Sequence, residues 1–324
     1  MKAVICTRYG PPEVLKIVET NKPVIKDNQV LVKVYATNVT SGDVRIRAFN
    51  VPISFWIPGR LFLGITKPRN QILGSVFAGK VEQVGKDVKN FKINDRVFGF
   101  KELEGGAYAE YISIDEDKAI TTIPENYSYI DASAILWGGG TSFYFLKKAN
   151  ITKDQKILIY GASGSLGTSA IQIAKYYGAN VTAVCSTENV ELVKSLGADR
   201  VIDYKVSKFY EEEIKYDVIF DTVGKCPIYD SINSLSANGT FINAVGTPGI
   251  NIKIKMALIG TQKIYVSGTF TAYKELVNNI KDHAQKNVLK PVVDKIFTLD
   301  EIVEAHRYVD LGHKKGNVVV TVDW

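Results

Sequence analysis

A glycine turn between an apolar run and a helix-like stretch constrains the fold of this chain more than any other segment. Gly161, Gly164 and Gly167 stand three residues apart, directly after the apolar run Ile157–Tyr160. Such a turn lets backbone N–H groups approach a pyrophosphate at the positive end of a helix, and its last glycine lets helix and strand pack closely. Glycine also serves turn geometry alone, but a strand before it and a helix after it favour a dinucleotide site.

The pattern after the turn predicts a parallel sheet. A helical stretch at Ala170–Ala174 is followed by the strand-like run Asn180–Cys185, which completes a βαβ unit. Further strands, separated by helix-length segments, are predicted at 201–202, 216–221, 239–245 and 263–270. Because strands and helices alternate, this part of the chain is predicted to be a doubly wound α/β domain.

The flanking regions have a different pattern. Up to about Thr122, short β-rich runs broken by Gly, Pro, Asn and Asp predict a β-barrel-like domain. These predicted strands are 1–6, 29–38, 76–84, 96–100 and 108–114. After Ala272 we expect a helix to Lys286, a strand near Val292, a helix from 300 to 311 and a strand from 317 to 322. This tail is expected to rejoin the first domain.

The composition excludes several classes of protein. Of the 324 residues 46% are hydrophobic and 10% aromatic, which rules out a disordered chain, a collagen-like fibre and a disulfide scaffold. The formal charge of +6 is spread along the chain, so nucleic-acid binding is not suggested. Three histidines lie in the last quarter and Cys6, Cys185 and Cys226 lie far apart, so a metal cluster is hard to build.

The chain start and the most apolar segment bear on location. Arg8 and Pro11 break the first apolar run too early for a targeting peptide, and we expect a cytoplasmic protein with reduced thiols. Segment 49–72 is interrupted by prolines and basic residues well short of a bilayer-spanning run. It is interpreted, in order of preference, as a lid or wall over an apolar pocket, a subunit contact or a membrane-surface loop.

The end of the second predicted strand bears on the choice between NADP(H) and NAD(H). A carboxylate there would bond the ribose 2′-hydroxyl of NAD, but this strand ends in Cys185-Ser186-Thr187. Small hydroxyl residues leave room for a 2′-phosphate, so NADP(H) is favoured. Glu188 argues the other way if it turns back to the ribose. Phosphate contacts are expected from Arg200, Tyr204 and Lys205.

Further motifs extend along nearly the whole chain. They are MKAVICTRYGPPE (1–13), ILGSVFAGKVEQV (72–84), GGAYAEY (105–111), KSLGADRVIDY (194–204), YDVIFDTVG (216–224) and GHKKGNVVVTV (312–322). In this order they resemble the medium-chain dehydrogenase/reductase superfamily and, within it, the zinc-independent quinone oxidoreductase-like branch. The resemblance implies a GroES-like β-barrel catalytic domain of residues 1–125 and 271–324. It implies a Rossmann NADP(H)-binding domain, with a doubly wound parallel sheet, of residues 126–270.

The resemblance also bears on metal. Zinc members carry a cysteine in a GxCGxD-like segment and a GHE triplet, whereas this chain has Thr40 in the first and Gly74-Ser75-Val76 in the second. The third ligand region, 136–140, contains neither cysteine nor histidine. No catalytic metal is therefore expected. Without such a Lewis acid, direct alcohol oxidation loses its main charge stabilisation.

The remaining chemistry is hydride transfer from NADPH to a small electron-poor acceptor, either a quinone or an α,β-unsaturated carbonyl. One alternative is an enoyl-thioester reductase in which segment 49–72 covers an acyl chain. Another is a non-catalytic NADP(H)-binding protein with a regulatory or partner role. A homodimer is expected through the edge strand 263–270, because exposed edges invite pairing and the family commonly dimerises there.

Among the candidate site residues, Thr40 occupies the former metal-ligand position and is the catalytic candidate, with β-strand filler as the alternative. Asp43 is expected to be structural. Thr141 matches the family threonine on the nicotinamide side of the cofactor, or caps a helix. The histidines are expected to be surface or structural residues: His283, His306 and His313.

The other cofactor candidates come from strand ends and from the tail. Val223 and Gly246 follow predicted parallel strands, where open α/β sheets bind ligands. Gly316 and Asn317 resemble the tail that closes over the cofactor, or form a simple turn. The predicted set is Thr141, Gly161, Ser163, Gly164, Ser165, Leu166, Gly167, Ser186, Thr187, Tyr204, Val223, Gly246, Gly316 and Asn317. A pocket wall is predicted from Phe55, Trp56, Phe62 and Trp137.

Overall fold

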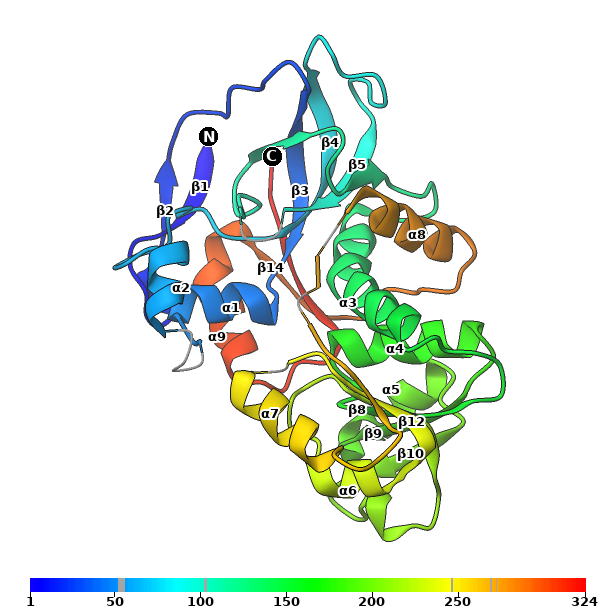
Figure 1. Cartoon of the computed structure of the whole chain (residues 1–324). Coiled ribbons are helices and arrows are strands. Elements are labelled where there is room, and N and C mark those ends of the chain that lie inside the picture. The colour runs from blue at the N-terminus through cyan, green and yellow to red at the C-terminus, as the bar shows by residue number, and fades with distance from the viewer. Residues whose placement is uncertain (52–55, 102–103, 246, 269, 272) are drawn as a thin grey trace. The chain divides into compact units, whose positions relative to one another are not determined.

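The computed structural model describes residues 1–51, 56–101, 104–245, 247–268, 270–271 and 273–324 (Figure 1). The chain forms two compact units. Unit 1 consists of Met1–Trp137, Thr271–Asn287 and Pro291–Trp324, and unit 2 consists of Gly138–Phe270 and Val288–Lys290. Most of the last 54 residues that the sequence analysis assigned to the tail therefore lie in the unit that contains the chain start.

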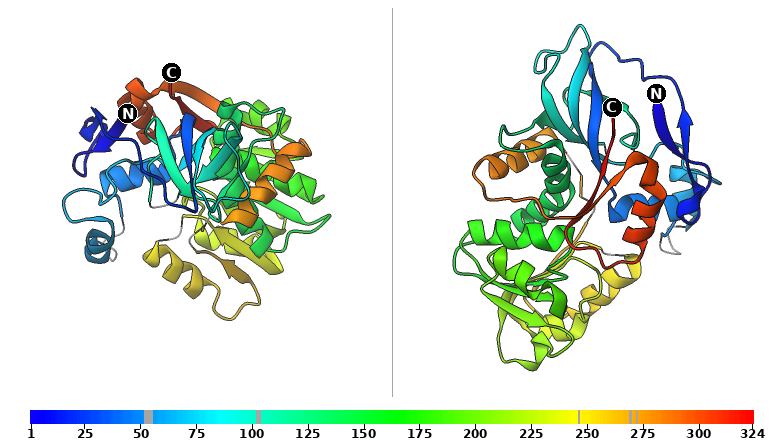
Figure 2. Two further views of the ribbon diagram at one scale, coloured as in Figure 1. Left: turned by 90° about the horizontal axis from the view of Figure 1, so that it is seen from above. Right: turned by 180° about the vertical axis from the view of Figure 1, so that it is seen from behind.

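Unit 1 is built, within the described residues, on a seven-stranded sheet. Its order is β14 (Val293–Thr298), β15 (Asn317–Thr321), β3 (Gln29–Asn38), β4 (Val76–Val84), β5 (Arg96–Phe100) and β7 (Ile120–Thr122), and β6 (Tyr111–Asp115) also pairs with β3. Strand β15 is antiparallel to β3, and Figure 2 shows the red strand beside the blue one. A separate antiparallel pair joins β1 (Lys2–Cys6) to β2 (Leu15–Glu19).

Helical segments accompany this sheet. The described ones are η1 (Pro12–Val14), α1 (Ser41–Ala48), α2 (Trp56–Leu63), α8 (Lys274–Gln285), η5 (Leu299–Glu301) and α9 (Ile302–Asp310). Residues of η1, α1, η5 and α9 contribute to the apolar core of the sheet. The apolar face of α9 repeats every three or four residues, and Ile302, Ala305 and Val309 on it join the valines of β3 in one core. This packing is what brings His306, on the same face, into the interior.

Unit 2 contains a six-stranded parallel sheet among its described residues. The order is β10 (Arg200–Asp203), β9 (Asn180–Cys185), β8 (Lys156–Tyr160), β11 (Tyr216–Asp221), β12 (Leu235–Asn243) and β13 (Ile264–Val266). Its helical segments are α4 (Ser165–Tyr176), η3 (Thr187–Asn189), α5 (Val190–Ser195), η4 (Phe209–Glu211), α6 (Ile228–Asn233) and α7 (Pro248–Ala257). The strand order reverses beside β8, which confirms the doubly wound arrangement.

Several elements differ from the predictions, and helices α1 and α2 were not predicted. Helix α3 (Tyr129–Lys148) was not predicted, because three consecutive glycines at 138–140 argue against a helix. The strand predicted at 239–245 lies earlier in the chain, because β12 begins at Leu235 and ends at Asn243. The edge strand β13 covers only Ile264–Val266 of the predicted 263–270. No helix of the described residues is long and apolar enough to cross a bilayer.

Candidate functional site

The glycine turn of unit 2 is shaped by three different constraints. Gly161 has φ +80°, a conformation that favours glycine. A Cβ atom at Gly167 would lie 2.4 Å from the carbonyl oxygen of Gly161, so only glycine lets α4 approach this closely. Gly164 is the N-cap of α4, where no side chain caps the first turn, and a Cβ atom there would meet nothing closer than 3.6 Å. The turn therefore leaves an open helix N-terminus, which suits a phosphate.

Asn189, which the sequence analysis did not single out, joins two of the predicted residues beside this turn. Its Nδ2 donates to Ser163 Oγ (3.2 Å) and to Ser186 Oγ (3.0 Å). The side chain is buried, and its Oδ1 has no hydrogen-bond partner among the described residues. An unsatisfied buried acceptor next to a glycine turn fits a polar ligand group.

Several residues predicted to contact a 2′-phosphate form hydrogen bonds or ion pairs with acidic side chains of the protein. Thr187 Oγ1 donates to Asp203 Oδ2 (2.5 Å), and Lys205 Nζ lies 3.1 Å from Glu188 Oε2. Hydrogen bonds from its own backbone N–H and from Lys205 hold the pKa of Glu188 at about 2. Arg200 bonds Glu212 instead. Tyr204 is half exposed and lies next to these groups in sequence.

The loop after β11 is held by a buried carboxylate. Asp221 accepts hydrogen bonds from the backbone N–H groups of Val223 (3.1 Å), Gly224 (2.8 Å) and Cys226 (3.1 Å). Burial raises the pKa of Asp221 despite these bonds. The Val223 side chain borders Gly161, since a Cβ atom there would lie 2.6 Å from Val223 Cγ1. The structure thus brings Val223 to the glycine turn, while predicted Gly246 lies outside the described residues.

Thr141 does not cap a helix, because it lies inside α3. Its side chain is buried, and Oγ1 has no hydrogen-bond partner among the described residues. Helix α3 approaches α4 closely at Gly138, where a Cβ atom would lie 2.2 Å from the carbonyl oxygen of Ser165. Ser165 and Leu166 form the first turn of α4, and the Leu166 carbonyl accepts a bond from Ser142 Oγ (2.8 Å).

In unit 1, Thr40 is not β-strand filler, because β3 ends at Asn38 and Thr40 is the N-cap of α1. Thr40 Oγ1 donates to Asp43 Oδ2 (2.6 Å) and accepts from the Asp43 backbone N–H (3.1 Å). The Thr40 N–H donates to the same carboxylate oxygen (2.9 Å). The single hydroxyl proton of Thr40 is therefore directed at Asp43. A catalytic role of Thr40 toward the acceptor stays a prediction.

Asp43 is an almost fully buried acid. Its exposed fraction is 3%, and burial raises its pKa to about 6, although the hydroxyls of Thr40, Tyr108 and Ser75 act to lower it. Tyr108 is fully buried, and burial and the nearby Asp43 carboxylate raise its pKa well above the ordinary value. Gly74 has φ +84°, and a Cβ atom there would lie 2.4 Å from the Tyr108 ring. Gly74 therefore makes room for Tyr108.

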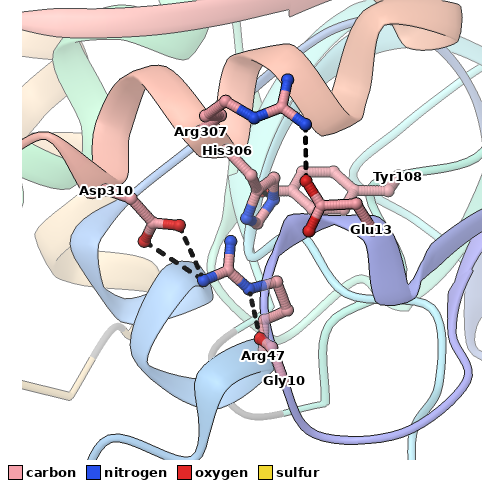
Figure 3. A network of polar contacts seen from close by, with 7 residues as sticks. All are labelled: Gly10, Glu13, Arg47, Tyr108, His306, Arg307 and Asp310. Atoms are coloured by element: carbon pink, nitrogen blue, oxygen red, sulfur yellow. Dashed lines mark hydrogen bonds and ion pairs between the residues drawn. The ribbon is translucent and has the colours of Figure 1, made fainter.

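Behind Tyr108 lies a buried polar network (Figure 3). His306 Nε2 lies 3.2 Å from the Tyr108 hydroxyl, and the two rings meet edge to face. Arg47 donates from Nε to the Gly10 carbonyl (3.1 Å) and from Nη2 to Asp310 (2.9 Å). Burial, with a smaller effect of Arg47, lowers the pKa of His306 to about 3. His306 is thus a buried neutral imidazole.

A cavity of about 170 Å³ lies in unit 1 with Asp43 on its wall. The other lining residues are Ile46, Phe62, Leu63, Pro68, Arg69, Asn70, Leu73, Gly74, Glu104 and Gly105. Of the predicted pocket wall, Phe62 lines this cavity. Trp56 is half exposed and packs on Phe49, Trp137 packs on Phe100 (5.5 Å between ring centres), and Phe55 lies outside the described residues.

The predicted tail residues are tied within unit 1. Gly316 has φ +56°, and a Cβ atom there would lie 2.3 Å from the Val292 carbonyl oxygen. Asn317 donates to the same carbonyl (3.1 Å), and its Oδ1 accepts from Asn38 Nδ2 (3.2 Å). Burial lowers the pKa of Lys314 to about 8, and its Nζ donates to the Gly316 carbonyl (2.6 Å). The tail therefore forms an ordered turn.

Two family models match different parts of this chain. Residues 26–125 match the alcohol dehydrogenase GroES-like domain, and residues 196–320 match the zinc-binding dehydrogenase family. The 2-methylene-furan-3-one reductase of Solanum lycopersicum is 32% identical over 336 residues, which cover 99% of this chain and 79% of that protein. The chloroplastic NADPH-dependent alkenal/one oxidoreductase of Arabidopsis thaliana is 31% identical with the same coverage. The quinone oxidoreductase structure from Coxiella burnetii matches with a TM-score of 0.88 at 28% identity, covering 100% of this chain and 99% of that one.

The chain belongs to the medium-chain dehydrogenase/reductase superfamily. It lies in the quinone oxidoreductase-like branch, as its motifs predicted, and it is an oxidoreductase. The fold is the predicted one, a GroES-like domain together with a Rossmann domain that carries the parallel sheet. Membership implies a nicotinamide cofactor.

The residues of unit 2 fit such a cofactor. The open N-terminus of α4 offers backbone N–H groups to a pyrophosphate, and the space at Gly164 would be filled by a Cβ atom. The unpartnered Oδ1 of Asn189 and Oγ1 of Thr141 are buried polar atoms of the kind that a dinucleotide satisfies. Within the described ranges, no group of three or more His, Cys, Asp or Glu side chains is placed to hold a metal ion.

Proposed function

We propose that the protein is a zinc-independent, NADPH-dependent reductase of quinones or α,β-unsaturated carbonyl compounds. The observation that carries this proposal is the chemistry at the superfamily's zinc-ligand positions. Thr40 caps α1, Ser75 lies beside Tyr108 and Asp43, and the third region is a glycine-rich stretch of α3. Bound NADPH would supply the hydride. The tomato and Arabidopsis relatives, whose names state reduction of such acceptors, support the proposed substrate class.

The test is NADPH oxidation by the full chain after EDTA treatment. Naphthoquinones and short enones are expected to be reduced at the same rate before and after chelation, and simple alcohols are not expected to reduce NADP⁺. Loss of turnover on chelation, restored by added zinc, would contradict zinc independence. Failure with every quinone and enone, while NADPH still binds by fluorescence, would instead favour the non-catalytic binding protein.

The preference for NADP(H) over NAD(H) is supported by the hydroxyl residues at the end of β9. Ser186 and Thr187 carry no charge to repel a 2′-phosphate, and half-exposed Tyr204 can donate to it. The Asp203 carboxylate, which accepts a hydrogen bond from Thr187, would repel a 2′-phosphate and so argues against NADP(H). Ser186→Ala and Tyr204→Phe should each weaken NADPH more than NADH in fluorescence titrations. An equal loss for both cofactors would refute the assignment.

An enoyl-thioester reductase is the second candidate, and the surface of α2 favours it. Ile57, Leu61 and Phe62 are each more than 60% exposed on this helix, and Phe62 also lines the cavity of unit 1. Apolar side chains at a cavity mouth suit an acyl chain. The efficiency kcat/KM should then rise with acyl length. An unchanged kcat/KM from short to long chains would count against this candidate.

A cytoplasmic homodimer is also proposed. Strand β13 is the last strand of the parallel sheet, and Ile264 on it is 53% exposed, so a second copy can extend the sheet there. Ile264→Lys should shift the mass measured by light scattering from dimer to monomer, whereas Ile57→Lys should not. Cell fractionation tests the location.

A further inference from the structure

The cavity of unit 1 joins apolar walls to one buried acid. Ile46, Leu63 and Leu73 line it, and Asp43 is the buried carboxylate on its wall. Its volume of about 170 Å³ equals the share of about six water molecules in the liquid, which suits a small ring or a short chain. Arg69 and Asn70 add polar groups to the lining. A small carbonyl compound matches this combination of apolar walls and few polar groups.

Hydrogen bonds and polar contacts link Asp43 to the residues behind it. The N–H and hydroxyl of Thr40 both donate to Asp43 Oδ2, and the Tyr108 hydroxyl acts to lower the pKa of the same carboxyl group. The Tyr108 hydroxyl also lies 3.2 Å from His306 Nε2. His306 Nδ1 is buried without a partner among the described residues. Asp43, Tyr108 and His306 therefore form one buried polar network.

We propose that this cavity binds the carbonyl acceptor and that Asp43 is the acid that protonates the acceptor once it is reduced. Tyr108 and His306 are positioning residues, since they act through Asp43. This inference rests on the proposed reductase function. It identifies the proton source for the reaction, which the glycine turn and the cofactor do not supply.

The step balances in atoms and electrons. Hydride addition forms a C–H bond at the β-carbon of the enone, and the C=C electron pair moves to give an enolate. The O–H bond of protonated Asp43 then breaks, and its proton bonds the enolate and leaves a saturated ketone. For a quinone, the same proton neutralises the hydroquinone oxyanion. The Asp43 carboxylate regains a proton from water that enters the cavity.

Other groups near the cavity fit this role less well. The Thr40 hydroxyl proton already goes to Asp43, and Tyr108 holds its proton too tightly because its pKa is raised. His306 is neutral and lies behind Tyr108, with Arg47 beyond it. At the cavity surface, Arg69 donates to the Leu61 carbonyl (2.6 Å), and Glu104 is paired with Lys101 (3.6 Å). Asp43, with a pKa of about 6, is matched to neutral pH.

The central test is Asp43→Asn, because asparagine keeps the acceptor that Thr40 needs and removes the acid. We expect kcat for an enone to fall by about 100-fold, the usual contribution of a general acid. NADPH affinity by fluorescence should stay close to wild type, and so should the Tm at pH 4, where folded Asp43 of the wild type is protonated and uncharged like asparagine. In wild type, kcat should fall as the pH rises through about 6, where Asp43 loses its proton. This decrease of kcat near pH 6 should be absent from Asp43→Asn.

A second readout needs no turnover. Infrared spectra of the protein without cofactor should show the C=O band of a protonated carboxylic acid that disappears as the pH rises through about 6 and that responds to Tyr108→Phe, which distinguishes it from any band of buried Asp221. That band should be missing from Asp43→Asn. Tyr108→Phe removes a hydroxyl that lowers the pKa of Asp43. The pH at which the infrared band disappears and the pH at which kcat falls should therefore both be higher in this variant. A purely structural role for Tyr108 would change the Tm and leave both midpoints in place.

The outcomes separate this inference from the proposed function. If wild type reduces enones and Asp43→Asn keeps the wild-type kcat and pH profile, the acid role is overturned and the reductase function stands. The same holds if the carboxylic acid band of wild type titrates below pH 4. If wild type reduces no acceptor, the proposed function fails and the acid role fails with it. Should Asp43→Asn not fold, the wild-type band and the Tyr108→Phe shifts still decide.

Discussion

The two parts of the candidate site are built by different means. In unit 2 the ligand-facing groups are backbone N–H groups and neutral side chains, which lie between Gly161 and Asn189 of the chain. In unit 1 they are buried ionisable side chains that the fold brings together, and one bond of the network joins residues 263 positions apart. A backbone site depends on shape and tolerates little added volume. A side-chain site depends on charge, so its properties should change with pH.

The largest effect is expected at the one glycine that shapes the side-chain site. Gly74→Ala should lower the free energy of unfolding by about 3 kcal/mol, because a Cβ atom would lie 2.4 Å from the Tyr108 ring at φ +84°. Urea unfolding measures this. Gly249→Ala is the control, since nothing lies within 4 Å of a Cβ atom there. If Gly74→Ala lowers the unfolding free energy no more than Gly249→Ala does, the Tyr108 ring does not pack closely against Gly74.

The backbone site should separate stability from binding. Gly167→Ala should cost about 2 kcal/mol of unfolding free energy, because its Cβ atom would lie 2.4 Å from the Gly161 carbonyl oxygen. Gly164→Ala has no contact closer than 3.6 Å and should unfold like wild type. It should nevertheless weaken NADPH binding at least tenfold, because the methyl group takes up phosphate space. Unchanged NADPH affinity in Gly164→Ala would place the phosphate elsewhere.

The side-chain site should show two opposing pH dependences. Folded Asp43 keeps a proton up to about pH 6 that the unfolded chain loses near its ordinary pKa of 3.8, so this residue lowers stability as the pH rises from 4 to 6. Folded His306 stays neutral down to about pH 3, whereas the unfolded residue gains a proton near 6.5, so it raises stability as the pH rises from 3 to 6.5. In wild type the two contributions offset each other.

Single substitutions should reveal separately how each of these two residues makes the unfolding free energy depend on pH. Asp43→Asn leaves the His306 contribution, so its unfolding free energy should rise with pH more steeply than that of wild type, by on the order of 1 kcal/mol per pH unit between 4 and 6. His306→Gln leaves the Asp43 contribution and should show the opposite change. Urea titrations at pH 4, 5, 6 and 7 measure both. Parallel profiles for all three proteins would mean that neither group is perturbed by folding.

The smallest effect concerns an exposed ion pair at the backbone site. Glu188→Gln frees Lys205, now 3.1 Å from the carboxylate, and should strengthen NADPH binding about threefold without changing NADH binding. Because the pair is exposed, the gain should shrink at high salt. An equal gain for both cofactors would show that Lys205 does not face the 2′-phosphate. Lys194, paired with Glu191 at 3.0 Å, provides the control through Glu191→Gln.

The strands were predicted well where local patterns determine them. Predicted strands 29–38, 76–84, 96–100 and 216–221 have the same bounds in the structure, because these segments are rich in β-branched and aromatic residues. Helices α1 and α2 were not predicted. Both have only eight residues, and neither shows the amphipathic pattern that predicts a helix. Helix α3 contains three consecutive glycines, and close packing against α4 at Gly138 outweighs their low helix propensity.

The sequence by itself determined the class of fold, the family and the place of the glycine turn, because these depend on periodicity and on contiguous motifs. Only the tertiary structure decided that Thr40 caps a helix, that Asn189 joins the glycine turn, and that His306 is buried behind Tyr108. A side chain's pKa and hydrogen-bond partners depend on what the fold places around it. Asp43 and His306 therefore acquire their properties from residues far away in the chain, which no local pattern records.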